Sequence, residues 1–218
     1  VLSGCKKSAQ VCNLMNTGDR EDVYEMVADM MNVELDPVDQ VSRADVKKPL
    51  MTKLYNSEAT PKAHFNANQL KAFNKALDGL VPGAMDVMKT INACCDNTKL
   101  SNSWTLPDGH VAHCKVEEMV DVNVSVAGMS FPFRYLKQQP SDNFRSLCPN
   151  VIHSIDGYVA REMIRRSDFE MAHIHDCFVF HPNYREQACQ LYREILADIA
   201  DMDLLESILT EITGKPVT

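Results

Sequence analysis

The sequence predicts an α+β fold, in which helices flank a small antiparallel sheet. Three observations lead to this class. Apolar residues recur at helical spacing in the N-terminal part of the chain and again near the C-terminus. In the middle, Val120, Val122, Val124 and Val126 alternate with polar residues, which is typical of a strand. Near the end, the apolar stretch 173–180 predicts a strand or a tight hairpin with an aspartate at its bend.

Four helices are expected in the N-terminal part, from their apolar spacing: 19–31, 43–56, 67–80 and 82–95. The acidic residues at the start of the first helix suit the positive end of a helix dipole, and Asp36-Pro37 ends its pattern. Pro49 is unfavourable inside the second helix. Pro82 suits the first turn of the fourth.

The remaining elements follow in a mixed order. Residues 103–111 predict a strand, a turn at Pro107-Asp108-Gly109 and a second strand. Apolar spacing then predicts a helix over 152–163, in which Asp156 and Gly157 set the helix start rather than do chemistry. After the 173–180 hairpin, two more helices are expected: 188–199 and 204–209.

Composition is ordinary for a globular protein, since 45% of the 218 residues are hydrophobic and 24% are charged. No apolar run approaches the ~20 residues that span a bilayer, so no membrane segment is expected. The net charge of −8 argues against a uniformly basic nucleic-acid-binding surface. Segment 43–53 is nevertheless basic, with Asp45 against four cations: Arg43, Lys47, Lys48 and Lys53. A local basic patch can bind phosphates on an acidic protein.

The eight cysteines include no C-x-x-C pair, the usual spacing of a zinc site. No secretory signal is visible at the start of the sequence. We therefore expect reduced thiols in a cytoplasmic protein, several of which, such as Cys189, act as small hydrophobic residues.

The basic segment carries a candidate nucleotide site. Arg43 and Lys47 are four residues apart, so they share a face of the expected helix, and Tyr55 falls near the same side. Two cations followed by an aromatic ring suit a triphosphate with a nucleoside behind it. Spacing alone favours the simpler interpretation, a solvated helix face with a tyrosine at its edge.

The hairpin 173–180 carries a candidate metal ligand. Asp176 lies between apolar residues, where a carboxylate loses hydration unless something binds it. Mg²⁺ prefers oxygen ligands and is a natural partner. Aspartate is also common in hairpin turns, so this stretch alone favours a plain turn.

Four stretches together resemble one family. The pattern Arg43-x3-Lys47-x7-Tyr55 resembles the fingers-helix motif of the single-subunit bacteriophage and mitochondrial RNA polymerases and of the related family A DNA polymerases. The other three resemble motifs of the RNA polymerase branch, namely W-x-x-P-D-G, P-N-x-x-H-S-x-D-G/A and H-D-S-F; here they are 104–109, 149–157 and 175–178. All four occur in family order, so the likeness covers nearly the whole chain.

This resemblance implies a polymerase right-hand fold, with helical fingers inserted into a palm that contains a small antiparallel sheet. Residues 1–16 correspond to a palm remnant after the first catalytic motif, 17–152 to the fingers and 153–218 to the C-terminal palm. The implied activity is template-directed transfer of a nucleoside monophosphate from an NTP to an RNA 3′-OH, with two Mg²⁺ ions. The implied partners are a DNA template, the nascent RNA and NTPs.

The resemblance also implies roles for residues on the fingers. Lys47 matches the lysine that contacts the incoming triphosphate and is a candidate to protonate the pyrophosphate leaving group. Arg43 matches its phosphate-binding companion. Tyr55 matches the tyrosine that closes the nucleotide site and helps to select a ribose.

In the palm, Asp176 matches the second catalytic aspartate, which binds both Mg²⁺ ions. His153 matches the histidine that works beside the motif tyrosine near the sugar 2′-OH. His175 is expected to approach the 3′ end of the growing strand. Outside this context, a helix-capping or buried histidine is the favoured interpretation of His153.

The sequence departs from the family in four respects, one of which is that the region between Tyr55 and Trp104 is shorter than usual. Asn56 stands where glycine usually follows the motif tyrosine, and Cys177 stands where serine is common. The first catalytic aspartate would precede the residues matched by Ser3-Gly4. The resemblance therefore predicts a fragment or one part of a split polymerase, in which an upstream segment or second polypeptide supplies that aspartate and the thumb. A phage-encoded protein in the host cytoplasm is expected.

Two alternatives stay open. A family A DNA polymerase typically carries Glu directly after the palm aspartate, where this chain has Cys177, and it lacks the W-x-x-P-D-G hairpin. A catalytically inactive nucleic-acid-binding subunit would have no chemical reason to keep every matched residue: Arg43, Lys47, Tyr55, His153 and Asp176.

Overall fold

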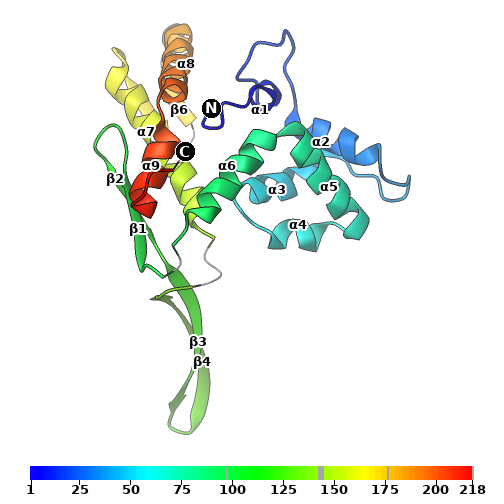
Figure 1. Cartoon of the computed structure of the whole chain (residues 1–218), viewed down its shortest axis with the longest axis vertical. Coiled ribbons are helices and arrows are strands. Elements are labelled where there is room, and N and C mark those ends of the chain that lie inside the picture. Colours follow the sequence, from blue (N-terminus) through cyan, green and yellow to red (C-terminus); the bar gives the residue numbers. More distant parts are fainter. Residues whose placement is uncertain (97, 142–144, 176, 218) are drawn as a thin grey trace.

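The computed structural model describes residues 1–96, 98–141, 145–175 and 177–217, and these form helices and antiparallel hairpins (Figure 1). The helices are α1 (Lys6–Val11), α2 (Val23–Asn32), α3 (Arg43–Leu54), α4 (Ala59–His64), α5 (Ala67–Leu80), α6 (Pro82–Ala93), α7 (Leu147–Arg166), α8 (Arg185–Asp201) and α9 (Leu204–Thr213), with a 3₁₀ turn η1 (Pro182–Tyr184). The strands are β1 (Ser101–Thr105), β2 (Val111–Lys115), β3 (Glu117–Val126), β4 (Met129–Gln138), β5 (Met171–Ile174) and β6 (Cys177–Phe180). The predicted α+β class is confirmed.

Helices α2 to α6 form one group, on the right in Figure 1. Polar side chains set where these helices begin. Asp22 accepts hydrogen bonds from the backbone N–H groups of residues 24 and 25 at the start of α2. Ser42 and Asp45 form a reciprocal capping box on α3, as Asn66 and Gln69 do on α5. The core of the group is apolar: Val27, Met31, Val46, Leu50, Phe73 and Leu77.

Helix α3 continues through Pro49, which the sequence marked as unfavourable. A proline inside a helix removes one backbone hydrogen bond, which costs about 3 kcal/mol. Pro49 is buried, as is its neighbour Leu50, which is 1% exposed. Burial of this face therefore offsets the loss, and the helix continues to Leu54.

The strands pair as three separate antiparallel hairpins among the described residues, rather than as one sheet. The predicted hairpin around Pro107-Asp108-Gly109 is confirmed as β1 and β2, with Thr105 opposite Val111. The predicted strand 120–126 lies in β3. Its partner β4 was missed, although Phe131, Phe133 and Tyr135 alternate in the sequence.

The β3–β4 hairpin projects away from the rest of the molecule (Figure 1). Its register puts Val122 opposite Phe133 and Val124 opposite Phe131, so one of its faces is apolar. These side chains are exposed, Phe133 by 56%. Pro132 has no backbone N–H to donate, so it leaves a gap in the hydrogen-bonding groups of β4. Proline is tolerated in this way in edge strands.

Helices α7, α8 and α9 form the second helical group, on the left in Figure 1. Helix α9 lies along β1, and two hydrogen bonds join them. The Glu211 carboxylate accepts from the Thr105 N–H (2.8 Å), and Lys99, just before β1, donates to the Ile212 carbonyl (2.8 Å). Buried residues of both helical groups belong to one continuous core. No described helix is long and apolar enough to cross a membrane.

Helix α7 begins at Leu147, and Asp156 and Gly157 lie in its middle. The expectation that these two residues set a helix start is therefore wrong. The helix begins earlier because its first turn is buried as well. The buried residues there are Leu147, Cys148 and Val151. The expected boundary between fingers and palm, 152/153, falls within this helix, and the domain assignment stays a prediction.

Candidate functional site

A cleft of about 1500 Å³ separates the end of α3 from the C-terminal helices. Its lining comes from the N-terminal segment, α3, α6, α7, the β5–β6 hairpin and α8. Three of the predicted site residues line it: Tyr55, His153 and His175. Segments from both ends of the chain therefore meet at one site.

Tyr55 and His153 contact each other across this cleft. Their rings are stacked, with centroids 5.2 Å apart and an angle of 11° between the planes. Tyr55 follows the last residue of α3, and His153 lies in the second turn of α7. Both side chains are exposed to the cleft, which leaves their edges accessible to a ligand.

Asn56 holds the backbone that presents Tyr55. Its φ is +67°, a left-handed conformation that glycine and asparagine adopt most easily. This gives a physical reason why asparagine can replace glycine after the motif tyrosine. The buried Asn56 amide also exchanges two hydrogen bonds with the Asn92 amide (2.9 and 3.0 Å) and donates to the Arg145 carbonyl (3.0 Å). The end of α3 is thereby tied to α6 and to the segment before α7.

Arg43 and Lys47 lie on α3 but do not line the cleft. The Arg43 Nε donates to Asp22 (2.8 Å), and its guanidinium lies 5.2 Å from the centre of the Tyr24 ring. The hydrogen bond from Arg43 holds the pKa of the Asp22 carboxyl below its ordinary value. Lys47 is exposed. The structure thus groups the predicted aromatic residues at the cleft, with the predicted phosphate-binding cations farther back along α3.

The β5–β6 hairpin brings His175, Cys177 and Phe178, the described residues of the predicted catalytic motif, to the cleft. Ile174 at the end of β5 pairs with Cys177 at the start of β6. His175 has a φ of +56°, which suits the first position of a type I′ turn. Asp176 lies outside the described residues. His173 on β5 and Cys177 on β6 both line the cleft.

Asp156, which the sequence predicted to set a helix start, lines the cleft. It lies three residues after His153 on α7, so the two share a helix face. Desolvation by the surrounding protein raises the pKa of the Asp156 carboxyl, and the electrostatic interaction with His153 acts in the opposite direction. Desolvation, followed by the charge of Asp156, raises the pKa of Tyr192 on α8. The spacing between His153 and Asp156 was the signal that could have identified this residue.

The W-x-x-P-D-G hairpin supports the helix that carries His153. Trp104 Nε1 donates to the Ser154 hydroxyl (2.9 Å), and Ser154 donates to the Val151 carbonyl (2.7 Å). Asp108 forms an ion pair with Arg161, which holds the pKa of its carboxyl below the ordinary value. Two of the matched stretches, 104–109 and 149–157, are therefore in direct contact.

The described residues alone do not make a two-metal site. Among the described positions, no three His, Cys, Asp or Glu side chains gather closely enough to hold a metal ion. Asp156 is the one described carboxylate that lines the cleft. Mg²⁺ prefers carboxylate oxygens, so a site here would need Asp176 and a further carboxylate.

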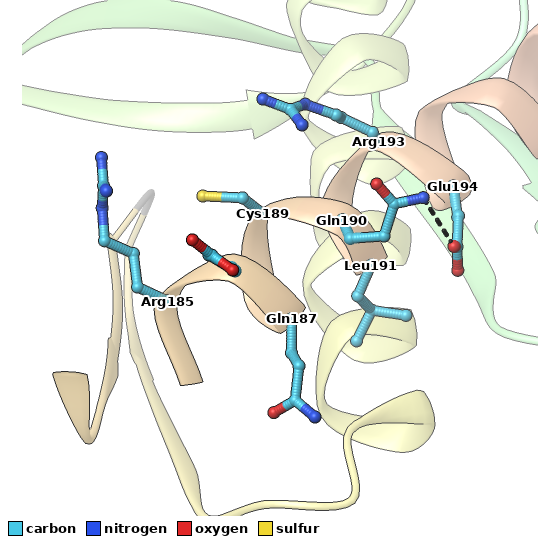
Figure 2. Close-up of a pocket in the computed structure, with 8 residues that line it drawn as sticks. Arg185, Gln187, Cys189, Gln190, Leu191, Arg193 and Glu194 are labelled. Atoms are coloured by element: carbon cyan, nitrogen blue, oxygen red, sulfur yellow. Dashed lines mark hydrogen bonds between the residues drawn. The ribbon is translucent and has the colours of Figure 1, made fainter. Parts of the chain in front are cut away.

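A second hollow lies on the surface of α8 (Figure 2). Arg185, Cys189 and Arg193 extend toward the same side of the helix, while Gln190 donates to Glu194 (2.9 Å). All its lining residues belong to one helix, so it is a groove between side chains rather than an enclosed pocket. Arg193 also reaches the main cleft, where it is the only described lysine or arginine of the lining.

No protein-family model matches the chain, and comparison with curated proteins gives no match either.

Proposed function

We propose that the chain is the fingers and C-terminal palm of a DNA-directed RNA polymerase of the single-subunit phage type. The observation that supports this most directly is the stacked pair of Tyr55 and His153. The two residues come from two different motif stretches, and the cleft that they share also contains the hairpin with His175. A chance likeness of four short motifs gives no reason for these side chains to meet.

In this proposal the reaction is an in-line displacement. The RNA 3′-hydroxyl gives its proton to solvent and its oxygen bonds to the α-phosphorus of an NTP, while the bond from that phosphorus to the bridging oxygen breaks and pyrophosphate leaves with that electron pair. Bound Mg²⁺ would supply positive charge to the attacking and leaving oxygens, held by Asp176 and by a carboxylate outside these residues. The Tyr55–His153 pair would hold the nucleoside and contact its sugar.

In this proposal Arg43 and Lys47 of α3 would bind the triphosphate of the incoming nucleotide. Arg43 uses its Nε for Asp22, which fixes the plane of the guanidinium. An arginine has further N–H groups, and these would face phosphate oxygens. Lys47 lies one turn farther along α3 and would neutralise charge on the leaving pyrophosphate. Both cations act on charge that grows in the transition state, so their loss should lower turnover.

The test is nucleotide addition to a primed single-stranded DNA template, with rNTPs and dNTPs in parallel. The protein assayed is the complete polypeptide together with any subunit that supplies the second carboxylate. We expect incorporation of rNTPs, and its loss in Asp176→Asn and Lys47→Ala. Lys48→Ala is the matched control, because Lys48 is an exposed neighbour on a different side of α3.

The outcomes separate the candidates. Near-normal turnover of Asp176→Asn with Mg²⁺ would contradict the metal assignment. A preference for dNTPs would identify a family A DNA polymerase instead. No incorporation of either nucleotide by the complete protein would leave the inactive nucleic-acid-binding subunit.

A further inference from the structure

One face of the β3–β4 hairpin consists of aliphatic and aromatic side chains. Because side chains alternate along a strand, every second pair of the register lies on the same face. Four successive pairs make up this apolar face: Val120–Tyr135, Val122–Phe133, Val124–Phe131 and Val126–Met129. The opposite face includes an ion pair between Asp121 and Arg134. The hairpin is therefore amphipathic, as is typical of an antiparallel ribbon that buries one side.

This apolar face has no cover within the described part of the chain. All residues of β3 and β4 are described, and none of them belongs to the buried core or to the partly buried residues packed against it. The hairpin instead projects away from the body (Figure 1). Six of its apolar side chains are 39–61% exposed: Val124, Val126, Met129, Phe131, Phe133 and Tyr135. A contiguous apolar patch marks an interaction site, and a two-stranded hairpin is marginally stable until its apolar face is covered.

The charges of the hairpin do not suit a nucleic acid. Residues 117–138 carry two cations, Arg134 and Lys137, against three carboxylates, Glu117, Glu118 and Asp121. Arg134 lies on the opposite face and is already paired with Asp121. A phosphate backbone is attracted by clustered cations, and the four apolar pairs carry none. The chemistry of this face suits another apolar protein surface.

We infer that the apolar face of the hairpin binds the same face of a second copy of the chain, which makes the protein a symmetric dimer. The centre of the face lies between the Val122–Phe133 and Val124–Phe131 pairs. A two-fold axis at this centre, in the plane of the interface and perpendicular to the strands, brings Phe131 of one copy to Phe133 of the other. Each contact then occurs twice, as a closed two-fold interface requires. This inference goes beyond the proposed function and does not depend on it.

The area of the face is that of a weak but specific dimer. Half-exposed apolar side chains of roughly 150–200 Å² each give roughly 500–600 Å² per copy, and thus roughly 1,000–1,200 Å² over both copies. This total meets the lower limit of specific interfaces, so we expect a dissociation constant in the micromolar range. Glu118 and Lys137 pair at the base of the same face and would form a polar rim. Unfolding measured well below the dissociation constant reports on the monomer.

The two bodies would not obstruct this contact. The hairpin projects from its own body (Figure 1), and the two-fold axis runs across the strands, so the two bodies lie at opposite ends of the paired hairpins. A second copy also presents an apolar face of the same length, without an unpaired charge among its four pairs. Burying the face therefore leaves no charged group without a partner.

Sedimentation velocity of the complete protein over a range of concentrations tests the dimer. Phe133→Lys puts a charge at the centre of the apolar face, so we expect it to weaken dimerisation by roughly tenfold or more. Leu136→Lys is the matched control, because Leu136 is 58% exposed, close to the 56% of Phe133, and lies on the opposite face. Leu136→Lys should dimerise as the wild type does.

A mixture of two variants tests the two-fold register and guards against misfolding. Phe131→Glu alone should weaken dimerisation as Phe133→Lys does. Because position 131 of one copy faces position 133 of the other, an equimolar mixture of the two variants should form a heterodimer in which a carboxylate meets an ammonium group. Recovery of the dimer in this mixture requires that both variants are folded and that the register is correct.

Three results would overturn the inference. The first is a wild-type protein that stays a single copy up to roughly 100 μM, far above a micromolar dissociation constant. The second is a dimer that Phe133→Lys and Leu136→Lys weaken equally, or that the mixture fails to restore, because the interface would then lie elsewhere. The third is a single-copy protein that loses binding of a nucleic acid or of a different protein in Phe133→Lys.

Discussion

The rings of Tyr55 and His153 are stacked with centroids 5.2 Å apart, although Tyr55 directly follows α3 and His153 lies on α7 in the other half of the chain. Stacked aromatic pairs at this distance contribute about 0.5–1.5 kcal/mol beyond burial. The stack fixes the position of the Tyr55 hydroxyl relative to the cleft. The position of one ring therefore depends on the other.

Under the proposed polymerase function, changing this pair should alter the selection of ribose over deoxyribose more than it alters folding. Tyr55→Phe keeps the ring but removes the hydroxyl, so we expect the rNTP:dNTP ratio of kcat/KM to fall by roughly tenfold or more, because a polar group that pairs with a sugar hydroxyl discriminates strongly. His153→Ala should lower the ratio as well by releasing the Tyr55 ring. Tyr135→Phe on the distant β3–β4 hairpin is the control. An unchanged ratio in Tyr55→Phe would exclude Tyr55 from sugar selection.

Asn56 should be replaceable by glycine at lower cost than by alanine. Either change removes the amide bonds to Asn92 and the Arg145 carbonyl, which costs about 1–3 kcal/mol of unfolding free energy. Alanine also opposes the φ of +67°, so Asn56→Ala should be less stable than Asn56→Gly by about 1 kcal/mol. Urea unfolding of the two variants measures the difference. Equal stabilities would mean that the left-handed backbone is not retained.

Trp104 and Ser154 should be energetically coupled. Their hydrogen bond of 2.9 Å joins the β1–β2 hairpin to α7. Trp104→Phe, Ser154→Ala and the double variant form a cycle, for which we expect a coupling energy of about 1 kcal/mol. Thermal or urea unfolding gives the four values. Additive losses would show that the bond contributes nothing to stability.

Glu162 should make stability depend on pH. It is 2% exposed, and hydrogen bonds from Arg165, then Arg166, hold the pKa of its carboxyl below the ordinary value of 4.5. A lowered folded-state pKa stabilises the protein above the unfolded-state pKa, and this contribution is lost as the pH falls through the folded-state value. Glu162→Gln should therefore cost about 2 kcal/mol at pH 7 and less in acid.

Urea unfolding of wild type and Glu162→Gln at neutral and acidic pH tests this. Asp198→Asn is the matched control, because Asp198 also binds Arg166 but is more exposed, and its loss should cost less than about 1 kcal/mol. A Glu162→Gln deficit that stays constant with pH would contradict the assigned ion pair.

The β3–β4 hairpin should contribute little to the stability of the body. Phe133 is 56% exposed, so Phe133→Ser should change the unfolding free energy by no more than about 0.5 kcal/mol. Phe133→Ser should also reduce the binding of a fluorescent dye that binds exposed apolar surface. Phe73→Ala in the buried core, by contrast, should cost about 3–5 kcal/mol. A large loss in Phe133→Ser would mean that the hairpin packs on the body.

The local features of this protein were determined by its sequence. Apolar spacing predicted α2, α3, α5 and α6, because a helical period can be read from residues a few positions apart in the chain. The Pro107-Asp108-Gly109 turn and the β5–β6 strands were predicted for the same reason. Short elements such as α1 and α4 were missed, since a single turn has too few apolar positions to show a period.

Long-range relationships were decided only by the tertiary structure. The likeness to known motifs suggested that Tyr55 and His153 work together, but no local rule brings the end of α3 to the second turn of α7. Burial of the continuous core and the Asn56–Asn92 and Trp104–Ser154 bonds fix that approach. The raised pKa of Asp156 and the apolar walls of the cleft likewise depend on which helices face each other, and side-chain packing across distant segments sets that.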